Sequence, residues 1–112
     1  MKPPERGDLV WIDFNPQAGH EQAGRRPALV LTPSSYNRAS GLAILCPVTS
    51  HAKGYPFECR VPDQLPVQGV VLSDHARSLD WRARHATFIC AAPPELVEDA
   101  TAKLHALLGD EQ

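Results

Sequence analysis

The chain has 112 residues, of which 43% are hydrophobic and 21% are charged, and its formal net charge is -2. This composition excludes a disordered chain, and the length predicts one domain over residues 1–112. No apolar run reaches the roughly 20 residues needed to span a bilayer, and residues 1–7 lack the apolar core of a signal peptide. We therefore expect a cytoplasmic protein without a membrane partner.

The cysteines indicate the redox compartment, and the charge distribution indicates which part of the chain could bind a polyanion. Cys46, Cys59 and Cys90 are odd in number and far apart, which predicts free thiols in a reducing compartment. Residues 19–61 carry five Lys or Arg against two Glu, a balance of +3. Residues 93–112, including Asp110 and Glu111, carry five acids against one Lys, a balance of -4. A polyanion would be attracted by the first region and repelled by the second.

Short runs rich in β-branched and aromatic residues predict strands. They cover residues 8–14, 28–32, 42–46, 57–61, 69–74 and 87–91. Pro47 is expected to interrupt the third strand, because proline cannot donate a ladder hydrogen bond. A polar loop, residues 19–27, separates the first two strands, and residues 51–56 form a second loop.

Two short helical turns and one longer helix are expected. Residues 33–41 predict one short helical turn ended by Gly41, and residues 81–84 another turn. The C-terminal helix begins after Pro93 and Pro94 and ends at Gly109. Its apolar residues recur at intervals of three and four and form one face: Leu96, Val97, Ala100, Leu104, Leu107 and Leu108. Antiparallel strands followed by one late helix predict a small β-barrel or curled sheet.

The pattern of potential ligands predicts neither a metal nor a cofactor. The five histidines show no close pairing, and the cysteines show no C-x-x-C spacing. A glycine-rich strand-to-helix turn and a G-x-S-x-G elbow are both missing from the sequence.

The two polar loops carry cationic and hydroxyl side chains suited to RNA cleavage. These residues are His20, Glu21, Arg25, Arg26, Thr49, Ser50, His51 and Lys53. RNA supplies its own nucleophile, the 2′-hydroxyl, so that the protein must move protons and stabilise charge on phosphorus. Arginine offers forked donors to phosphate oxygens, and a carboxylate or imidazole can transfer protons. An ordinary solvated loop is the alternative interpretation.

Several motifs resemble the MazF/PemK toxin family. They are Gly7-Asp8, Glu21-Gln22-Ala23-Gly24, Arg26-Pro27, Tyr36-Asn37, Thr49, Lys53-Gly54-Tyr55-Pro56-Phe57-Glu58, Ser73-Asp74 and Asp80-Trp81-Arg82-Ala83-Arg84. The block around Glu21 and Arg26 stands at the family's position, about a dozen residues after the strand opened by Gly7-Asp8.

The resemblance implies a fold, an activity and partners. The implied fold is mainly β with appended helices: a small SH3-like antiparallel β-barrel, as in MazF, PemK and CcdB, with a C-terminal α-helix. The implied function is that of a toxin of a toxin–antitoxin pair. It is a sequence-specific, metal-independent endoribonuclease that cleaves single-stranded RNA and leaves 2′,3′-cyclic phosphate and 5′-hydroxyl ends. The implied partners are a second copy of the chain and an antitoxin with an acidic, disordered tail.

Site residues follow by position. Arg26 and Thr49 match the family's catalytic residues, and Glu21 has an accompanying role. Because a guanidinium is effectively always protonated, we expect Arg26 to stabilise charge rather than act as a general base. The expected RNA-binding residues are His20, Gln22, Arg25, Asn37, Ser50, Lys53 and Tyr55, with Phe14 a further candidate for base contacts.

Two positions depart from the family. His20 stands where the family often has Ser, and His75 where it commonly has Gln. His20 could transfer protons or simply be a solvated loop residue. A different function also stays open at this point, because toxins of the same fold can bind DNA gyrase without cleaving RNA.

Overall fold

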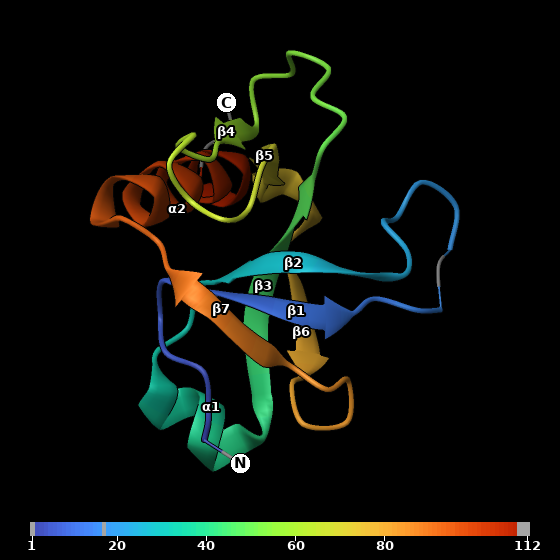
Figure 1. The fold of residues 1–112 in the computed structure, drawn as a ribbon, viewed down its shortest axis with the longest axis vertical. Helices are drawn as coiled ribbons and strands as arrows, with labels where there is room; N and C mark the ends of the chain where they lie inside the picture. Colours follow the sequence, from blue (N-terminus) through green and yellow to red (C-terminus); the bar gives the residue numbers. More distant parts are fainter. Residues whose placement is uncertain (1, 17, 110–112) are drawn as a thin grey trace.

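The computed structural model describes residues 2–16 and 18–109, so that Asp110 and Glu111 of the predicted acidic segment lie outside the described residues. Figure 1 shows the arrangement of the elements. In chain order they are β1 (Asp8–Asp13), β2 (Arg25–Val30), α1 (Ser34–Ser40), β3 (Leu42–Thr49), β4 (Glu58–Arg60), β5 (Val70–Leu72), the 3-10 helix η1 (Ser73–His75), β6 (Arg77–Asp80), β7 (Thr87–Ala91) and α2 (Pro94–Gly109). Among these helices, none is long and apolar enough to cross a membrane.

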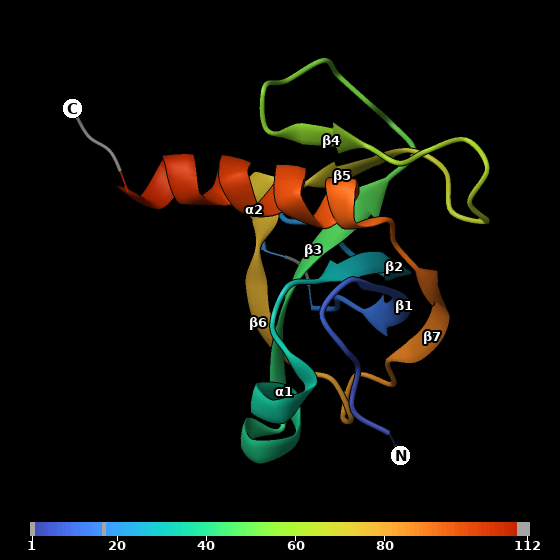
Figure 2. The same cartoon turned by 90° about the vertical axis from the view of Figure 1, so that its left-hand side faces the viewer.

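The strands form one antiparallel sheet in the order β4-β5-β3-β2-β1-β7, and β6 pairs with the outer edge of β3. α2 lies across the sheet beside β4 and η1 (Figure 2). The prediction of a mainly β fold with a C-terminal helix is therefore confirmed.

Side chains on the two faces of the sheet pack into two cores. One core lies beneath α2 and includes Leu9, Leu29, Cys46, Val71, Leu96 and Ala100. The other joins β1, β2, β3 and β6 and includes Val10, Ile12, Phe14, Ala28, Val30, Leu45 and Trp81. Alternation of side chains along β1 places Leu9 in the first core and Val10 in the second.

Two prolines lie inside strands, which corrects two predicted boundaries. β2 begins at Arg25 rather than at residue 28, so that Arg25 to Pro27 belong to a strand and not to the loop. β3 runs through Pro47 instead of stopping before it. Pairing with β6 covers Leu42 to Leu45, and pairing with β5 begins only at Val48. Pro47 therefore falls between two partner strands, where a missing N–H costs little.

The C-terminal helix is only partly covered. Leu96 and Ala100 are buried, as the apolar periodicity predicts. Leu107 and Leu108 are 42% and 77% exposed, so that the predicted apolar face does not pack along its whole length. Figure 2 shows the reason, because the last turns of α2 extend past the edge of the sheet.

Candidate functional site

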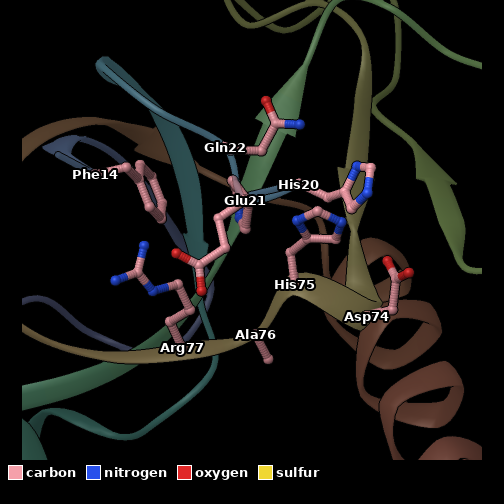
Figure 3. Close-up of a pocket in the computed structure, with 9 residues that line it drawn as sticks. Phe14, His20, Glu21, Gln22, Asp74, His75, Ala76 and Arg77 are labelled. Carbon is pink, nitrogen blue, oxygen red and sulfur yellow. The ribbon is translucent and has the colours of Figure 1, made fainter. Parts of the chain in front are cut away.

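Two adjoining pockets lie where the β1–β2 loop meets β3 and η1. The first, here the Arg77 pocket, has a volume of about 260 Å³ and is lined by Phe14, His20, Glu21, Gln22, Pro47, Asp74, His75, Ala76 and Arg77 (Figure 3). The second, here the Thr49 pocket, is lined by His20, Thr49, His51, Lys53, Tyr55, Glu58, Leu72, Asp74 and His75. His20, Asp74 and His75 belong to both linings, so the two pockets adjoin at these side chains, and the pair of pockets is here called the groove.

The base of the β1–β2 loop is fixed by hydrogen bonds from a distant arginine. Arg84 Nη1 donates to the carbonyl oxygens of Asp13 (3.1 Å) and Asn15 (2.7 Å). The Asn15 side chain in turn accepts a bond from the backbone N–H of Gly24 (2.9 Å). These contacts hold the two ends of the loop together and place residues 20–22 over the groove.

Arg26 joins this loop to the end of β3. Its Nε donates to the carbonyl oxygen of Ala23 (3.0 Å), and its Nη1 donates to that of Val48 (3.4 Å). Arg26 lines neither pocket, but the second bond places its guanidinium against the residue that precedes Thr49. The two predicted catalytic residues are thus brought to one end of β3.

Thr49 is the last residue of β3 and is only 7% exposed. Its Oγ1 accepts a bond from the backbone N–H of His51 (3.2 Å), which turns the chain away from the strand. Gly69 packs against the Thr49 backbone: a Cβ there would lie 2.1 Å from the Thr49 carbonyl oxygen, and the φ of Gly69 is +118°. Only glycine meets both conditions, so Gly69 is needed for the close approach of β5 to Thr49.

The loop after Thr49 is shaped by one carboxylate. Glu58 accepts bonds from the backbone N–H groups of Lys53 (2.9 Å) and Gly54 (3.0 Å). The resulting turn presents Lys53 and Tyr55 to the Thr49 pocket, and the Tyr55 side chain is 60% exposed.

Arg77 and Phe14 give the Arg77 pocket a cationic and aromatic wall. The Arg77 Cζ lies 6.0 Å from the centroid of the buried Phe14 ring, within the range of a cation–π contact. Arg77 Nη1 is buried and has no hydrogen-bond partner among residues 2–16 and 18–109. The Glu21 carboxylate points into the same pocket (Figure 3).

Most of the residues predicted to bind RNA line this groove. Four of the seven do so: His20, Gln22, Lys53 and Tyr55. Glu21 and Thr49, which were predicted to be catalytic, line the groove as well. Arg25 lines neither pocket, because its Nη2 donates to the His85 carbonyl oxygen (2.7 Å) and to Thr87 Oγ1 (3.0 Å) at β7. Ser50 is exposed beside His51 but is not part of either lining.

Asn37 has a structural role, which corrects its predicted contact with a base. It is fully buried in α1, and its amide donates to the carbonyl oxygens of Pro4 (2.8 Å) and Thr32 (2.9 Å). Its Oδ1 accepts a bond from Thr32 Oγ1 (2.7 Å), and its carbonyl oxygen accepts one from Trp81 Nε1 (2.8 Å). A side chain so occupied has no free face for RNA.

Arg77 is the groove residue that sequence reasoning missed. Its only signal was that it is the sole Lys or Arg between Asp74 and Asp80. Asp74 and His75 also line both pockets, and the departure at His75 did mark that position. Over the described ranges 2–16 and 18–109, no group of three or more His, Cys, Asp or Glu is arranged to hold a metal ion.

The sequence model of a known family, described as the PemK-like, MazF-like toxin of type II toxin–antitoxin systems, matches residues 5–108. The chain belongs to this toxin family. The endoribonuclease toxin MazF of Escherichia coli K12 is 45% identical to it over 106 residues, which is 95% of each chain. The endoribonuclease toxin ChpB of the same strain is 38% identical over 112 residues, covering 93% of each.

Solved structures of this family share the fold. MazF from Deinococcus radiodurans is 57% identical and superposes with a TM-score of 0.94, over 96% of this chain and 98% of that one. A MazE–MazF structure from the same organism is also 57% identical, with a TM-score of 0.86 over 96% and 97% of the two chains. The resemblance to the MazF/PemK family and the fold that it implies are therefore confirmed.

Proposed function

We propose that this toxin-family chain is a sequence-specific endoribonuclease that cleaves single-stranded RNA without a metal ion. Its relatives MazF and ChpB carry the name endoribonuclease toxin, which supports the reaction class. The observation that carries the proposal is the meeting of Arg26 and Thr49 at the end of β3, beside a groove that also holds Glu21.

The proposed reaction uses the 2′-hydroxyl of the RNA as nucleophile. Its oxygen forms a bond to phosphorus, the bond from phosphorus to the 5′-oxygen breaks, and the products carry a 2′,3′-cyclic phosphate and a 5′-hydroxyl. Arg26 stabilises the added negative charge on the phosphoryl oxygens. Thr49 donates its hydroxyl hydrogen to one of those oxygens. Glu21 accepts the 2′-hydroxyl proton, and the leaving 5′-oxygen takes up a proton from solvent water to become the 5′-hydroxyl.

The two pockets suggest how the RNA strand lies. Lys53 and Tyr55 in the Thr49 pocket suit a phosphate and a stacked base, respectively. The Arg77 pocket offers the Gln22 amide and the Arg77 guanidinium to a base that is turned out of the strand, and the buried Phe14 ring supports Arg77 from the core side. Hydrogen bonds to the edge of that base would supply sequence specificity.

We propose a cognate antitoxin as the partner. The MazE–MazF structures from D. radiodurans, at 49–57% identity, support such a partner. A disordered acidic tail would suit the excess positive charge of residues 19–61. We also propose a homodimer, for which the exposed Trp11 (42%) on β1 and Phe88 (62%) on β7 are candidate contacts. The cytoplasm is the proposed location, and it suits the three free cysteines.

Cleavage of a long single-stranded RNA in EDTA, followed by mapping of the new 5′ ends, tests this function. We expect discrete cuts that are lost in Arg26→Ala and in Thr49→Ala. Arg38→Ala is the matched control, because it removes an exposed guanidinium from α1, outside the groove. Absence of cuts, or cuts that persist in both variants, would overturn the assignment and favour a toxin that binds a protein such as DNA gyrase.

A further inference from the structure

The groove has an unusual charge composition for a site that binds a polyanion. Its fixed charges are the carboxylates of Glu21, Glu58 and Asp74 and the cations of Lys53 and Arg77. Among the lining residues, three carboxylates against two cations leave one net negative charge while the imidazoles are neutral, and Arg26 at the end of β3 adds one positive charge beside the groove. His20, His51 and His75 supply the remaining titratable side chains, together with the Tyr55 hydroxyl.

Two of the imidazoles stand at the centre of the groove. His20, on the loop before β2, and His75, in η1, each line both pockets, and Figure 3 shows them at the same junction. Within residues 2–16 and 18–109, neither ring takes part in a hydrogen bond. The His51 ring does have a hydrogen-bond partner, because its Nδ1 lies 3.4 Å from Ser50 Oγ.

We infer that His20 and His75 bind RNA phosphates in their protonated form and thereby make the affinity of the groove for RNA depend on pH. This inference rests on the proposed function, because it takes RNA as the ligand. Imidazoles generally gain a proton between pH 8 and pH 5. Protonation of this pair changes the fixed charge of the groove from one net negative to one net positive, and a bound phosphate favours the charged form.

The charged groups around the pair come from four segments. Glu21 lies on the same loop as His20, Asp74 precedes His75 in η1, and Arg77 begins β6. The segment after β3 contributes His51, Lys53, Tyr55 and Glu58. The Glu58 carboxylate accepts two backbone N–H bonds, so that it serves the fold of that segment. Asp74 and Glu21 are therefore the carboxylates that the two protonated imidazoles offset at the junction.

The salt dependence of binding gives a direct measurement. The probe is an RNA that spans one mapped cut and carries 2′-deoxyribose at the cut nucleotide, so that it lacks the nucleophile. Each phosphate contact adds about 0.7 to the slope of log K against log salt for a single strand, so two contacts add about 1.4 at pH 5.5 relative to pH 8.0. A fourfold rise in salt should then weaken binding about sevenfold more at pH 5.5.

The double variant His20→Ser, His75→Gln should lose this difference in slope, while the control His105→Gln, on α2, should keep it. If RNA is cut but the wild-type slopes are equal at the two pH values, the inference is wrong and the proposed function stands. The same holds if the folded double variant keeps the wild-type difference. If RNA is not cut at all, the proposed function and the inference fail together.

Discussion

Asn37 and Arg77 both have a buried side-chain nitrogen atom, but they differ in hydrogen bonding: the Asn37 nitrogen has partners, and Arg77 Nη1 has none in the described part of the chain. The Asn37 amide is engaged by Pro4 and Thr32. A buried donor without a partner costs about 1–3 kcal/mol. The region around α1 is therefore built for stability, whereas the groove wall keeps a buried donor that no group in the described part of the chain satisfies.

The largest expected effect is a loss of stability on substitution of Asn37. Asn37→Ala removes three side-chain hydrogen bonds and leaves buried groups unpaired, so we expect a loss of about 3 kcal/mol in the free energy of unfolding. Urea denaturation measures this loss. The rate of RNA cleavage per folded molecule should stay near wild type, and Arg38→Ala serves as the exposed control on the same helix. If the Asn37→Ala protein folds but does not cleave RNA, Asn37 has a role in RNA binding and the structural interpretation is wrong.

Thr49→Val should have the opposite effect, with a large loss of RNA cleavage and a small loss of stability. The substitution keeps the shape of the side chain but removes a donor for a phosphoryl oxygen, so we expect a loss of about 100-fold in cleavage rate. Its effect on unfolding should be about 1 kcal/mol, because one hydrogen bond from the His51 N–H is lost. Single-turnover cleavage and urea denaturation separate the two effects. Thr49→Ser, which retains a hydroxyl, should recover most of the activity; full activity in Thr49→Val would exclude the hydroxyl from the reaction.

Stability should also depend on pH through a core thiol. Burial raises the pKa of Cys46 to about 12. The unfolded chain loses this proton at a lower pH than the folded one, so the thiol's contribution is complete below about pH 8.5 and decreases as the pH rises towards 12. By pH 10 the loss is about 2 kcal/mol. Denaturation at pH 7 and pH 10 measures it, and Cys46→Ala should show a smaller decrease; equal decreases would contradict this origin.

Arg77→Met tests whether the Arg77 side chain serves RNA binding rather than stability. Loss of a charged donor to RNA should reduce kcat/KM about tenfold. The free energy of unfolding should not decrease, because the substitution removes a buried donor without a partner, which costs about 1–3 kcal/mol, and this outweighs the lost contact with Phe14. Arg82→Met is the matched control: its guanidinium also lies over an aromatic ring, Trp81, at 5.1 Å, but outside both pockets. A similar loss of activity in both variants would indicate a nonspecific effect of charge.

Much of the fold could be predicted from local pattern. Runs rich in β-branched and aromatic residues indicated β1 and β7, and the apolar repeat between Pro94 and Gly109 indicated α2. The strand boundaries at Pro27 and Pro47 could not be predicted, because they depend on where distant partner strands begin and end. Proline alone indicates a missing donor, not whether a neighbour needs it.

The candidate site was predictable where its residues are adjacent in sequence. His20, Glu21 and Gln22 occupy one loop, so their shared composition indicated a site. Arg77 reaches the same pocket only because η1 turns the chain between β5 and β6. Asn37 was misassigned because it lies among serines in a polar segment, which gives no sign of the cavity formed by Pro4, Thr32 and Trp81.

The position of β3 in the sheet determines how the molecule unfolds. It pairs with β2 on one edge and with both β6 and β5 on the other, so every path through the sheet passes along it. The strand that ends in Thr49 therefore cannot detach without disrupting both halves. Native-state amide exchange should be slowest in β3, and the groove should persist until the whole sheet unfolds cooperatively.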